Sequence, residues 1–155
     1  MKDLIVKDNA LIQASYTLGL VEQRLILLAI VEARETGRGI TPDSYLDIHA
    51  NHYAQQFSVS VKSAYQSLSE AVETLYQRQV TLHKTYKGYP ERQKVRWVSG
   101  ISYIEKLAAV RIRFSPDVIP LITRLEENFT SYDLEQVSGL QSSYAVRLYE
   151  LLIQW

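Results

Sequence analysis

Seven consecutive apolar residues, Leu25 to Val31, dominate the hydrophobic pattern of the chain. A helix formed by such a run is apolar on every side and is therefore buried on every side. Polar residues continue the helical spacing on both flanks, so we predict a central helix over residues 20–36, between Gly19 and the stop signal Gly37. The run is far shorter than the ~20 apolar residues that cross a bilayer. A buried parallel strand is the alternative interpretation of the same run.

Helical spacing recurs in two neighbouring segments, a short one at Ala50 to Phe57 and a longer one from about Ser60 to Arg78. A turn of about three residues separates them, which is the spacing of a helix-turn-helix, whose second helix enters the major groove of DNA. Any two short helices packed together have a similar spacing, so both interpretations stay open. The residues of the second helix that face solvent and are candidates for DNA contact are Lys62, Ser63, Gln66 and Ser67.

Between residues 80 and 114 the period changes to two, which is typical of strands. Apolar and polar residues alternate at 80–83, 95–103 and 110–114, and a turn signal begins at Lys87-Gly88. We predict a three-stranded antiparallel β-sheet from this region. Its outer face would carry Lys94, Arg96, Arg111 and Arg113. A sheet beside a helix-turn-helix is the plan of a winged helix, so the predicted fold class is α+β, winged helix.

Further elements complete this picture. A brief strand is expected at residues 45–48, and further helices at 9–15, from an N-cap at Asp117 to about 128, and from Ser142 or Ser143 onward. The total is about five to six helices in one domain. No stop signal follows the last apolar residue, Trp155, so we expect a fragment that once led onward.

The charge of the chain is unevenly distributed. The formal net charge is zero, yet residues 80–115 hold 8 basic and 2 acidic residues, a net charge of +6. Such a segment favours a polyanionic partner, and a solvated surface is the alternative. The chain has no cysteine, which excludes disulfides and thiolate metal sites, and its charged first residues form no signal peptide. A cytoplasmic location is therefore expected.

Catalytic signatures are missing from the sequence. His49 and His52 are spaced as H-x-x-H, but no cysteine and no well-placed carboxylate completes a metal site. The two histidines also fail the pattern of a rolling-circle nickase. No glycine-rich phosphate loop or nucleophile elbow is present. We therefore predict no catalytic residue, no metal, no cofactor and no enzymatic activity.

Several short motifs suggest a family. Residues 142–152, which read SSYAVRLYELL, resemble the signature of iteron-binding plasmid replication initiators. Similar motifs stand at Asn9-Ala10-Leu11, Glu22-Gln23-Arg24-Leu25, Phe114-Ser115-Pro116 before Leu121, and Phe129-Thr130 before Tyr132. Within that family, the resemblance points to initiators encoded by plasmid-like circular DNAs recovered from milk and meat.

The resemblance has clear implications. It implies that residues 1–155 form an N-terminal winged-helix domain, and that a second, C-terminal winged-helix domain, absent from this chain, reads the iteron repeats. The first domain would dimerise and contact mainly the DNA backbone. The implied partners are double-stranded DNA carrying origin iterons, a second copy in a homodimer, and host replication proteins, with no membrane. The alternative is a protein-interaction module that dimerises without DNA affinity of its own; exposed sheet edges fit such a role.

Overall fold

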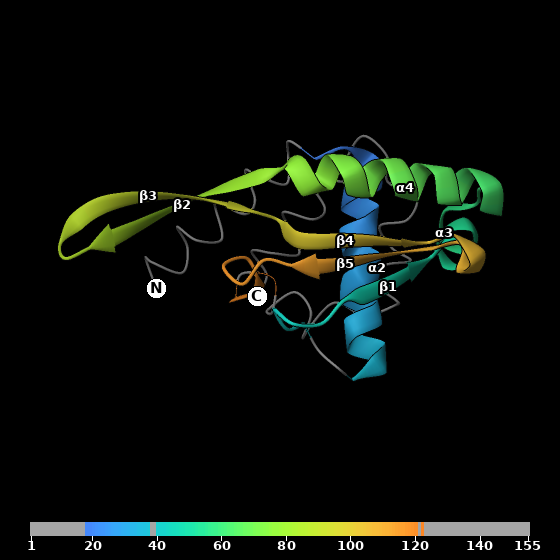
Figure 1. The fold of residues 1–155 in the computed structure, drawn as a ribbon, viewed down its shortest axis with the longest axis horizontal. Coiled ribbons are helices and arrows are strands. Elements are labelled where there is room, and N and C mark those ends of the chain that lie inside the picture. The colour runs from blue at the N-terminus through green and yellow to red at the C-terminus, as the bar shows by residue number, and fades with distance from the viewer. Residues whose placement is uncertain (1–17, 38–39, 121, 123–155) are drawn as a thin grey trace.

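The structure, a computed structural model, describes residues 18–37, 40–120 and 122. The elements are α2 (Leu20–Thr36), β1 (Leu46–His49), α3 (Ala50–Phe57), α4 (Val61–Gln77), β2 (Gln79–Tyr86), β3 (Tyr89–Arg96), β4 (Val98–Ile104), the 3-10 turn η1 (Glu105–Leu107) and β5 (Ala109–Phe114) (Figure 1). This described part contains three α-helices, fewer than the five to six predicted for the whole chain. The helix predicted at 9–15, the last helix predicted from Ser142 or Ser143 onward, and the part beyond residue 122 of the helix predicted from Asp117 to about 128 lie outside the described residues.

The central helix α2 has the predicted bounds. The backbone N–H of Gly19 donates to Glu22 Oε1 at 2.7 Å, and Gly37 ends the helix in the left-handed region with φ 72°. Leu25 to Val31 are each at most 2% exposed, which confirms the prediction of a helix buried on every side. The charged residues Glu22 and Arg24, which precede the apolar run, are buried as well, so the buried part of the helix extends beyond the run.

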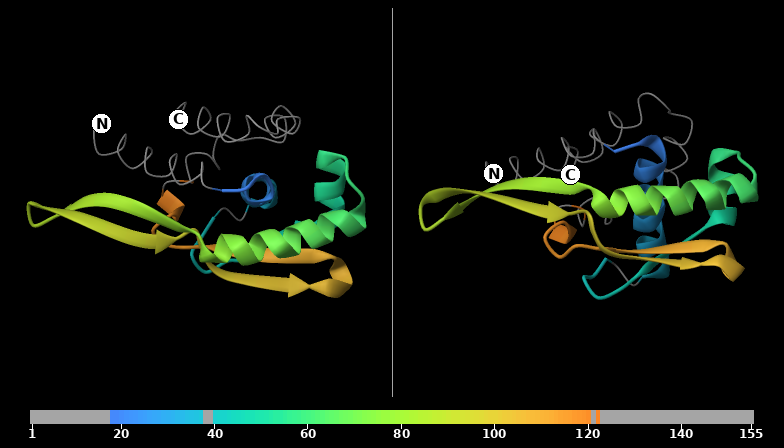
Figure 2. Two further views of the ribbon diagram at one scale, coloured as in Figure 1. Left: turned by 90° about the horizontal axis from the view of Figure 1, so that it is seen from above. Right: turned by 45° about the horizontal axis from the view of Figure 1, so that its top comes forward.

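Helices α3 and α4 confirm the two predicted helical segments. The chain leaves α3 at Ser58, which adopts the left-handed conformation with φ 57°. Ser60 then caps α4, because its hydroxyl accepts a hydrogen bond from the backbone N–H of Ser63 at 3.1 Å. Helix α4 lies across α2, and its apolar stripe of Ala64, Leu68 and Leu75 is buried (Figures 1 and 2).

The strands form two sheets, so the prediction that the strands of residues 80–114 form a single sheet is wrong. One antiparallel sheet has the order β1-β5-β4, and β2 pairs with β3 in a separate hairpin. The division occurs at Trp97, which is 1% exposed. Its N–H donates to the Arg78 carbonyl at 3.4 Å, and its own carbonyl accepts from the Ser115 N–H at 3.1 Å. The predicted strand over 95–103 is therefore split into β3 and β4, and β1 completes the three-stranded sheet.

The hairpin of β2 and β3 projects from the body as an arm, at the opposite end of the long axis from α3 (Figures 1 and 2). Val80 and Leu82 anchor its base in the core, whereas residues 83–92 are all exposed. Lys87 and Gly88 form the two-residue turn with φ values of 51° and 85°. Positive φ at both positions gives the twist that two-residue hairpins require, which explains the glycine.

After β5 the chain turns sharply. The carbonyl of Ser115 accepts from the N–H groups of Val118 and Ile119 at 3.1 and 3.3 Å. The first turn thus begins two residues earlier than the predicted cap at Asp117. Among the described helices, none has the length and apolar character needed to cross a membrane.

Candidate nucleic-acid interface

The structure distributes the predicted DNA-contacting residues over three separate places. One group lies in the first half of α4, a second on β3 in the arm, and a third on β5 in the three-stranded sheet (Figure 1). The start of α4 adjoins α3 at one end of the molecule, whereas the arm projects from the other end (Figure 1). The predicted residues therefore do not form one continuous surface.

The group on α4 consists of Lys62, Ser63 and Gln66, which are exposed, and Ser67, which is half-buried. The side-chain amide of Gln66 donates to Glu70 Oε1 at 3.4 Å. With one lysine among exposed carboxylates, this helix face attracts phosphate weakly.

Glu73, one helical turn beyond Glu70, has its own partner. Its carboxylate accepts a hydrogen bond from the hydroxyl of Tyr103 on β4. Partial burial and this hydrogen bond raise the pKa of Tyr103 to about 12. The contact fastens α4 to the edge of the three-stranded sheet.

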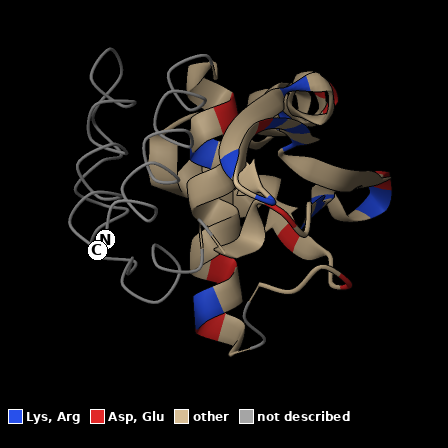
Figure 3. Ribbon diagram, turned by 90° about the vertical axis from the view of Figure 1, so that its left-hand side faces the viewer, with Lys and Arg blue, Asp and Glu red and all other residues tan. Residues whose placement is uncertain are grey.

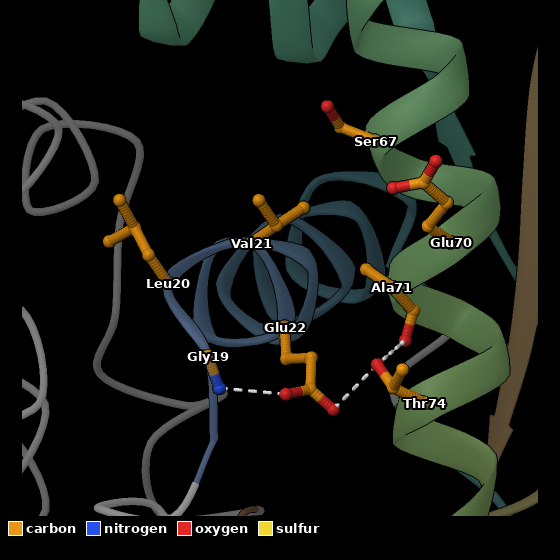
Figure 4. A pocket seen from close by; sticks show the side chains of 8 residues that line it. All are labelled: Gly19, Leu20, Val21, Glu22, Ser67, Glu70, Ala71 and Thr74. Carbon is orange, nitrogen blue, oxygen red and sulfur yellow. Dashed lines mark hydrogen bonds between the residues drawn. The ribbon is translucent and has the colours of Figure 1, made fainter.

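Ser67 lines an open cleft of about 300 Å³ between α4 and the start of α2 (Figure 4). The carboxylate of Glu22 lies on one side of this cleft and that of Glu70 on the other. The carboxylate of Glu22 has partners within the protein, because it accepts hydrogen bonds from the Thr74 hydroxyl at 3.1 Å and from Arg78 at 3.2 Å. Two carboxylates make this cleft unsuitable for a phosphate.

The two arginines on β5 face outward from the three-stranded sheet but are engaged by their own protein. Arg111 Nε lies 2.8 Å from Asp47 Oδ1, and Arg113 Nε donates to the Ser99 hydroxyl at 3.1 Å. Both guanidinium groups contact Tyr45, with distances of 4.9 and 4.8 Å from their central carbons to the ring centroid. The charge of Arg111 is thus balanced by Asp47.

The basic residues on the arm have a different environment. Arg92, Lys94 and Arg96 occupy alternate positions of β3, opposite His83, Thr81 and Gln79 in the register of the hairpin. Side chains at alternate positions point to the same side of a strand, so these three form one cationic face. The side chains of Arg92 and Lys94 are exposed and form no hydrogen bond or ion pair with other described residues. Figure 3, in which the arm points toward the viewer, shows basic positions recurring along it.

Arg96 stands at the base of the cationic face. Its Nη1 donates to the Tyr76 carbonyl at 3.0 Å, and its guanidinium carbon lies 5.1 Å from the centroid of the Tyr76 ring. These contacts hold Arg96 in place, while its side chain stays exposed.

The opposite face of the arm ends in two aromatic residues. Tyr86 on β2 lies directly across from Tyr89 on β3, and the two are 58% and 72% exposed. We call this pair the tyrosine tip. Lys84 lies on the same face, across from Glu91, and Lys87 in the turn places its Nζ 5.3 Å from the Tyr86 ring centroid.

Sequence reasoning missed Lys84, Lys87 and Arg92 as candidates, although all three lie in the segment of net charge +6. The period of two that selected Lys94 and Arg96 also includes Arg92, two residues earlier. It was overlooked because the apolar alternation that marked the strand begins only at Val95. Lys84 and Lys87 could have been found from the Lys87-Gly88 turn signal, because the end of a hairpin is exposed to solvent.

The two histidines considered for metal binding lie at the junction of β1 and α3, His49 exposed and His52 half-buried. In the part of the chain that the structure describes, no three metal-ligating side chains gather closely enough to hold an ion.

Comparison with known proteins relates the whole chain to replication proteins. The family described as "Initiator Replication protein, WH1" matches residues 4–153. A "Replication initiation protein" of Escherichia coli is 31% identical over 157 residues, covering 99% of this chain and 48% of the relative. An "Uncharacterized 27.6 kDa protein" of Escherichia coli is 24% identical over 159 residues, covering 97% and 66% respectively. The chain thus spans about half the length of the first of these relatives.

Solved structures share the fold. The WH1 domain of MSBI1.176, a replication protein isolated from a multiple sclerosis patient, superposes with a TM-score of 0.75 at 54% identity, covering 84% of this chain and 99% of that domain. The Pi initiator protein, solved in complex with iteron DNA, superposes with a TM-score of 0.67 at 19% identity. The match covers 93% of this chain and 60% of that protein.

Proposed function

The chain belongs to the family of initiator replication proteins, as their WH1 winged-helix domain, and we propose that it contacts the DNA backbone for a plasmid-type replication initiator. The observation that carries this proposal is the cationic face of the arm, Arg92, Lys94 and Arg96. The proposed role is binding, and it requires no catalytic residue, metal or cofactor.

The cationic face suits phosphates better than base edges. Alternate residues of an extended strand are ~7 Å apart, so the three side chains form a row that can follow a strand of DNA. Lysine and arginine contacts to phosphates fix the position and orientation of a protein on DNA without reading sequence. The α4 face of Lys62, Ser63, Gln66 and Ser67 is a secondary candidate, because it carries one cation. Arg113 is a secondary candidate beside it, and Arg111 a weaker one because of Asp47.

The wider role is proposed from the family. The Pi initiator was solved with iteron DNA, and this supports origin iterons as the DNA that this domain helps to bind. A tandem C-terminal winged-helix domain would read the repeats, and the greater length of the Escherichia coli replication initiation protein is consistent with that arrangement. Host replication proteins as partners, a cytoplasmic location, and an origin among plasmid-like circular DNAs from milk and meat complete the proposal.

A second candidate function is self-association. Within the described residues β1 pairs with β5 alone, so it is an edge strand of the three-stranded sheet, and edge strands can pair with a strand of a second copy. A homodimer could form along this edge with or without DNA affinity. Sedimentation of the 155-residue chain separates the two roles. A dimer that fails to bind any duplex supports the protein-interaction module, and a chain that shifts duplex DNA supports the DNA-binding domain.

The DNA-binding proposal is tested by duplex affinity. The change Arg92→Ala/Lys94→Ala removes the two cations of the cationic face whose side chains have no hydrogen-bond or ion-pair partner among the described residues. The control Arg34→Ala/Lys106→Ala removes the same charge from exposed positions on α2 and η1. Because phosphate contacts do not depend on sequence, a duplex of arbitrary sequence serves as the probe. We expect the arm variant to bind several-fold more weakly than the control. Equal affinities of the two variants contradict the proposal.

A further inference from the structure

We propose that the tyrosine tip, Tyr86 and Tyr89, stacks on unpaired bases, so that the arm holds single-stranded DNA. This inference rests on the proposed function and deepens it, because it assigns the end of the same arm a second form of DNA. An initiator that acts where an origin opens would meet such a strand beside the duplex.

The position of the two rings carries the first part of the argument. Tyr86 is the last residue of β2 and Tyr89 the first residue of β3, and they lie directly opposite each other across the Lys87-Gly88 turn. They point to the same side of the hairpin. The two residues are 58% and 72% exposed, whereas Val80 and Leu82 at the base of the arm are buried in the core. Two large aromatic side chains are thus presented to solvent beside the turn of the arm. This turn lies at the outer end of the hairpin, away from the three-stranded sheet (Figures 1 and 2).

The charges around the rings carry the second part. Lys84 lies two residues before Tyr86 on the same face, and Lys87 stands over the Tyr86 ring. Arg92, Lys94 and Arg96 lie on the reverse face. Glu91 is the single acidic residue between Gln79 and Arg96. The surroundings of the tip therefore favour a polyanion.

Aromatic rings with cations beside them, as Lys84 and Lys87 stand beside Tyr86, are typical of surfaces that bind single strands, where bases stack on the rings and the cations contact the backbone. In a duplex the base faces are already stacked on one another. The rings therefore gain more from an unpaired strand than from a duplex, whereas the cationic face serves both. This difference makes the tyrosine tip separable from the cationic face by experiment.

A structural explanation of the pair is that two aromatic residues opposite each other stabilise their own hairpin. Variants distinguish this explanation from base stacking. Tyr86→Val/Tyr89→Val keeps residues that favour strands but removes the flat rings. Tyr86→Phe/Tyr89→Phe keeps the rings and removes the hydroxyls. Thermal unfolding followed by circular dichroism reports whether either change alters the fold.

The test measures fluorescence anisotropy of two labelled probes with the 155-residue chain. One probe is an oligothymidylate of about 16 nucleotides, an upper value for the site of a small binding module. The other is the duplex of arbitrary sequence. The valine variant is expected to bind the single strand at least about fivefold more weakly than the wild type, since stacking of each base contributes about that factor or more. Its duplex affinity should change less than twofold, and the phenylalanine variant should match the wild type on both probes.

The outcomes are distinct. The inference is overturned if the wild type shows no detectable binding of the single strand. It is also overturned if the valine variant loses no affinity for the single strand, or loses equal affinity for both probes. Equal losses of single-strand affinity in the valine and phenylalanine variants overturn it as well. Another partner is indicated if an acidic peptide or anionic vesicles bind the wild type but not the valine variant, while both proteins bind the oligothymidylate equally. That result overturns the inference. Failure of the proposed function is seen separately, as unchanged duplex affinity in Arg92→Ala/Lys94→Ala.

Discussion

Glu22 on α2 accepts hydrogen bonds from both Nε and Nη2 of Arg78, each at 3.2 Å. Arg78 is the C-cap residue that follows α4, immediately before the first strand of the arm. Glu22 is buried, and it also accepts from the Gly19 N–H at the start of its own helix. The carboxylate of Glu22 therefore caps the N-terminus of the central helix and also holds the base of the arm against that helix.

Removing the charge of Glu22 should weaken this junction. We expect Glu22→Gln to lower the free energy of unfolding by about 1–2 kcal/mol, a value between those of exposed and fully buried ion pairs because Arg78 is partly exposed. Urea denaturation measures the change. Glu32→Gln, on the same helix, is the control and should cost less than half as much. Equal losses would show that the contact with Arg78 adds nothing.

A side chain at Gly100 is predicted to displace the side chain of Tyr45. A methyl group added at Gly100 would lie 3.2 Å from Tyr45 Cζ and nearer still to its hydroxyl oxygen. We expect Gly100→Ala to destabilise the protein by about 1–3 kcal/mol, as overpacking commonly does. Adding Tyr45→Phe removes the nearest atom and should recover part of that loss. A double variant that is less stable than the sum of its single changes contradicts this geometry.

The contact of Tyr103 with Glu73 predicts a pH dependence. Burial and this hydrogen bond raise the pKa of Tyr103 from 10.0 to about 12, so the folded protein keeps a proton that the unfolded chain loses. The stabilising contribution is therefore complete below pH 10 and is lost as the pH rises from 10 to about 12.

We expect Tyr103→Phe to lower stability by about 0.5–1.5 kcal/mol at neutral pH and to differ less from the wild type as the pH passes 10. Chemical denaturation at several pH values measures this difference. Tyr89→Phe, the same change at the exposed tip, serves as control and should show no such convergence. A constant difference between wild type and Tyr103→Phe across this range argues against the assigned cause.

Arg111 should matter more for stability than for DNA. Its ion pair with Asp47 and its contact with Tyr45 predict a loss of about 0.5–1.5 kcal/mol for Arg111→Ala. Duplex affinity should fall less than in Arg92→Ala, which removes an arm cation without a partner among the described residues. Unfolding and anisotropy measurements on the two variants make the comparison. A larger loss of affinity in the Arg111 variant would place the DNA on the three-stranded sheet.

The helices were predictable because each signal is local. The apolar run at 25–31, the spacing within α3 and α4, and the caps Gly19 and Ser60 depend on residues within one or two turns. The burial of Glu22 was not predictable in this way. Its partners Thr74 and Arg78 lie 52 and 56 residues further along the chain, and nothing near Glu22 marks them.

The same distinction explains the sheet and the site. Alternation identified the strands, but pairing of β1 with β5 joins residues 60 or more positions apart. Trp97 fits the alternation of its neighbours, so its backbone contacts with Arg78 and Ser115 had no local signal. Alternation placed Lys94 and Arg96 on one face, as the hairpin register confirms. It gave no indication that Arg111 has Asp47 as partner.

The central claim is that cations on the arm neutralise DNA phosphates, and the salt dependence of binding tests it most directly. The logarithm of duplex affinity falls linearly with the logarithm of salt concentration, and each phosphate contact contributes about one unit to the slope. We predict that Arg92→Ala/Lys94→Ala reduces the magnitude of this slope by about 2, while Arg34→Ala/Lys106→Ala leaves it unchanged. Identical slopes for the wild type and the arm variant would contradict the account.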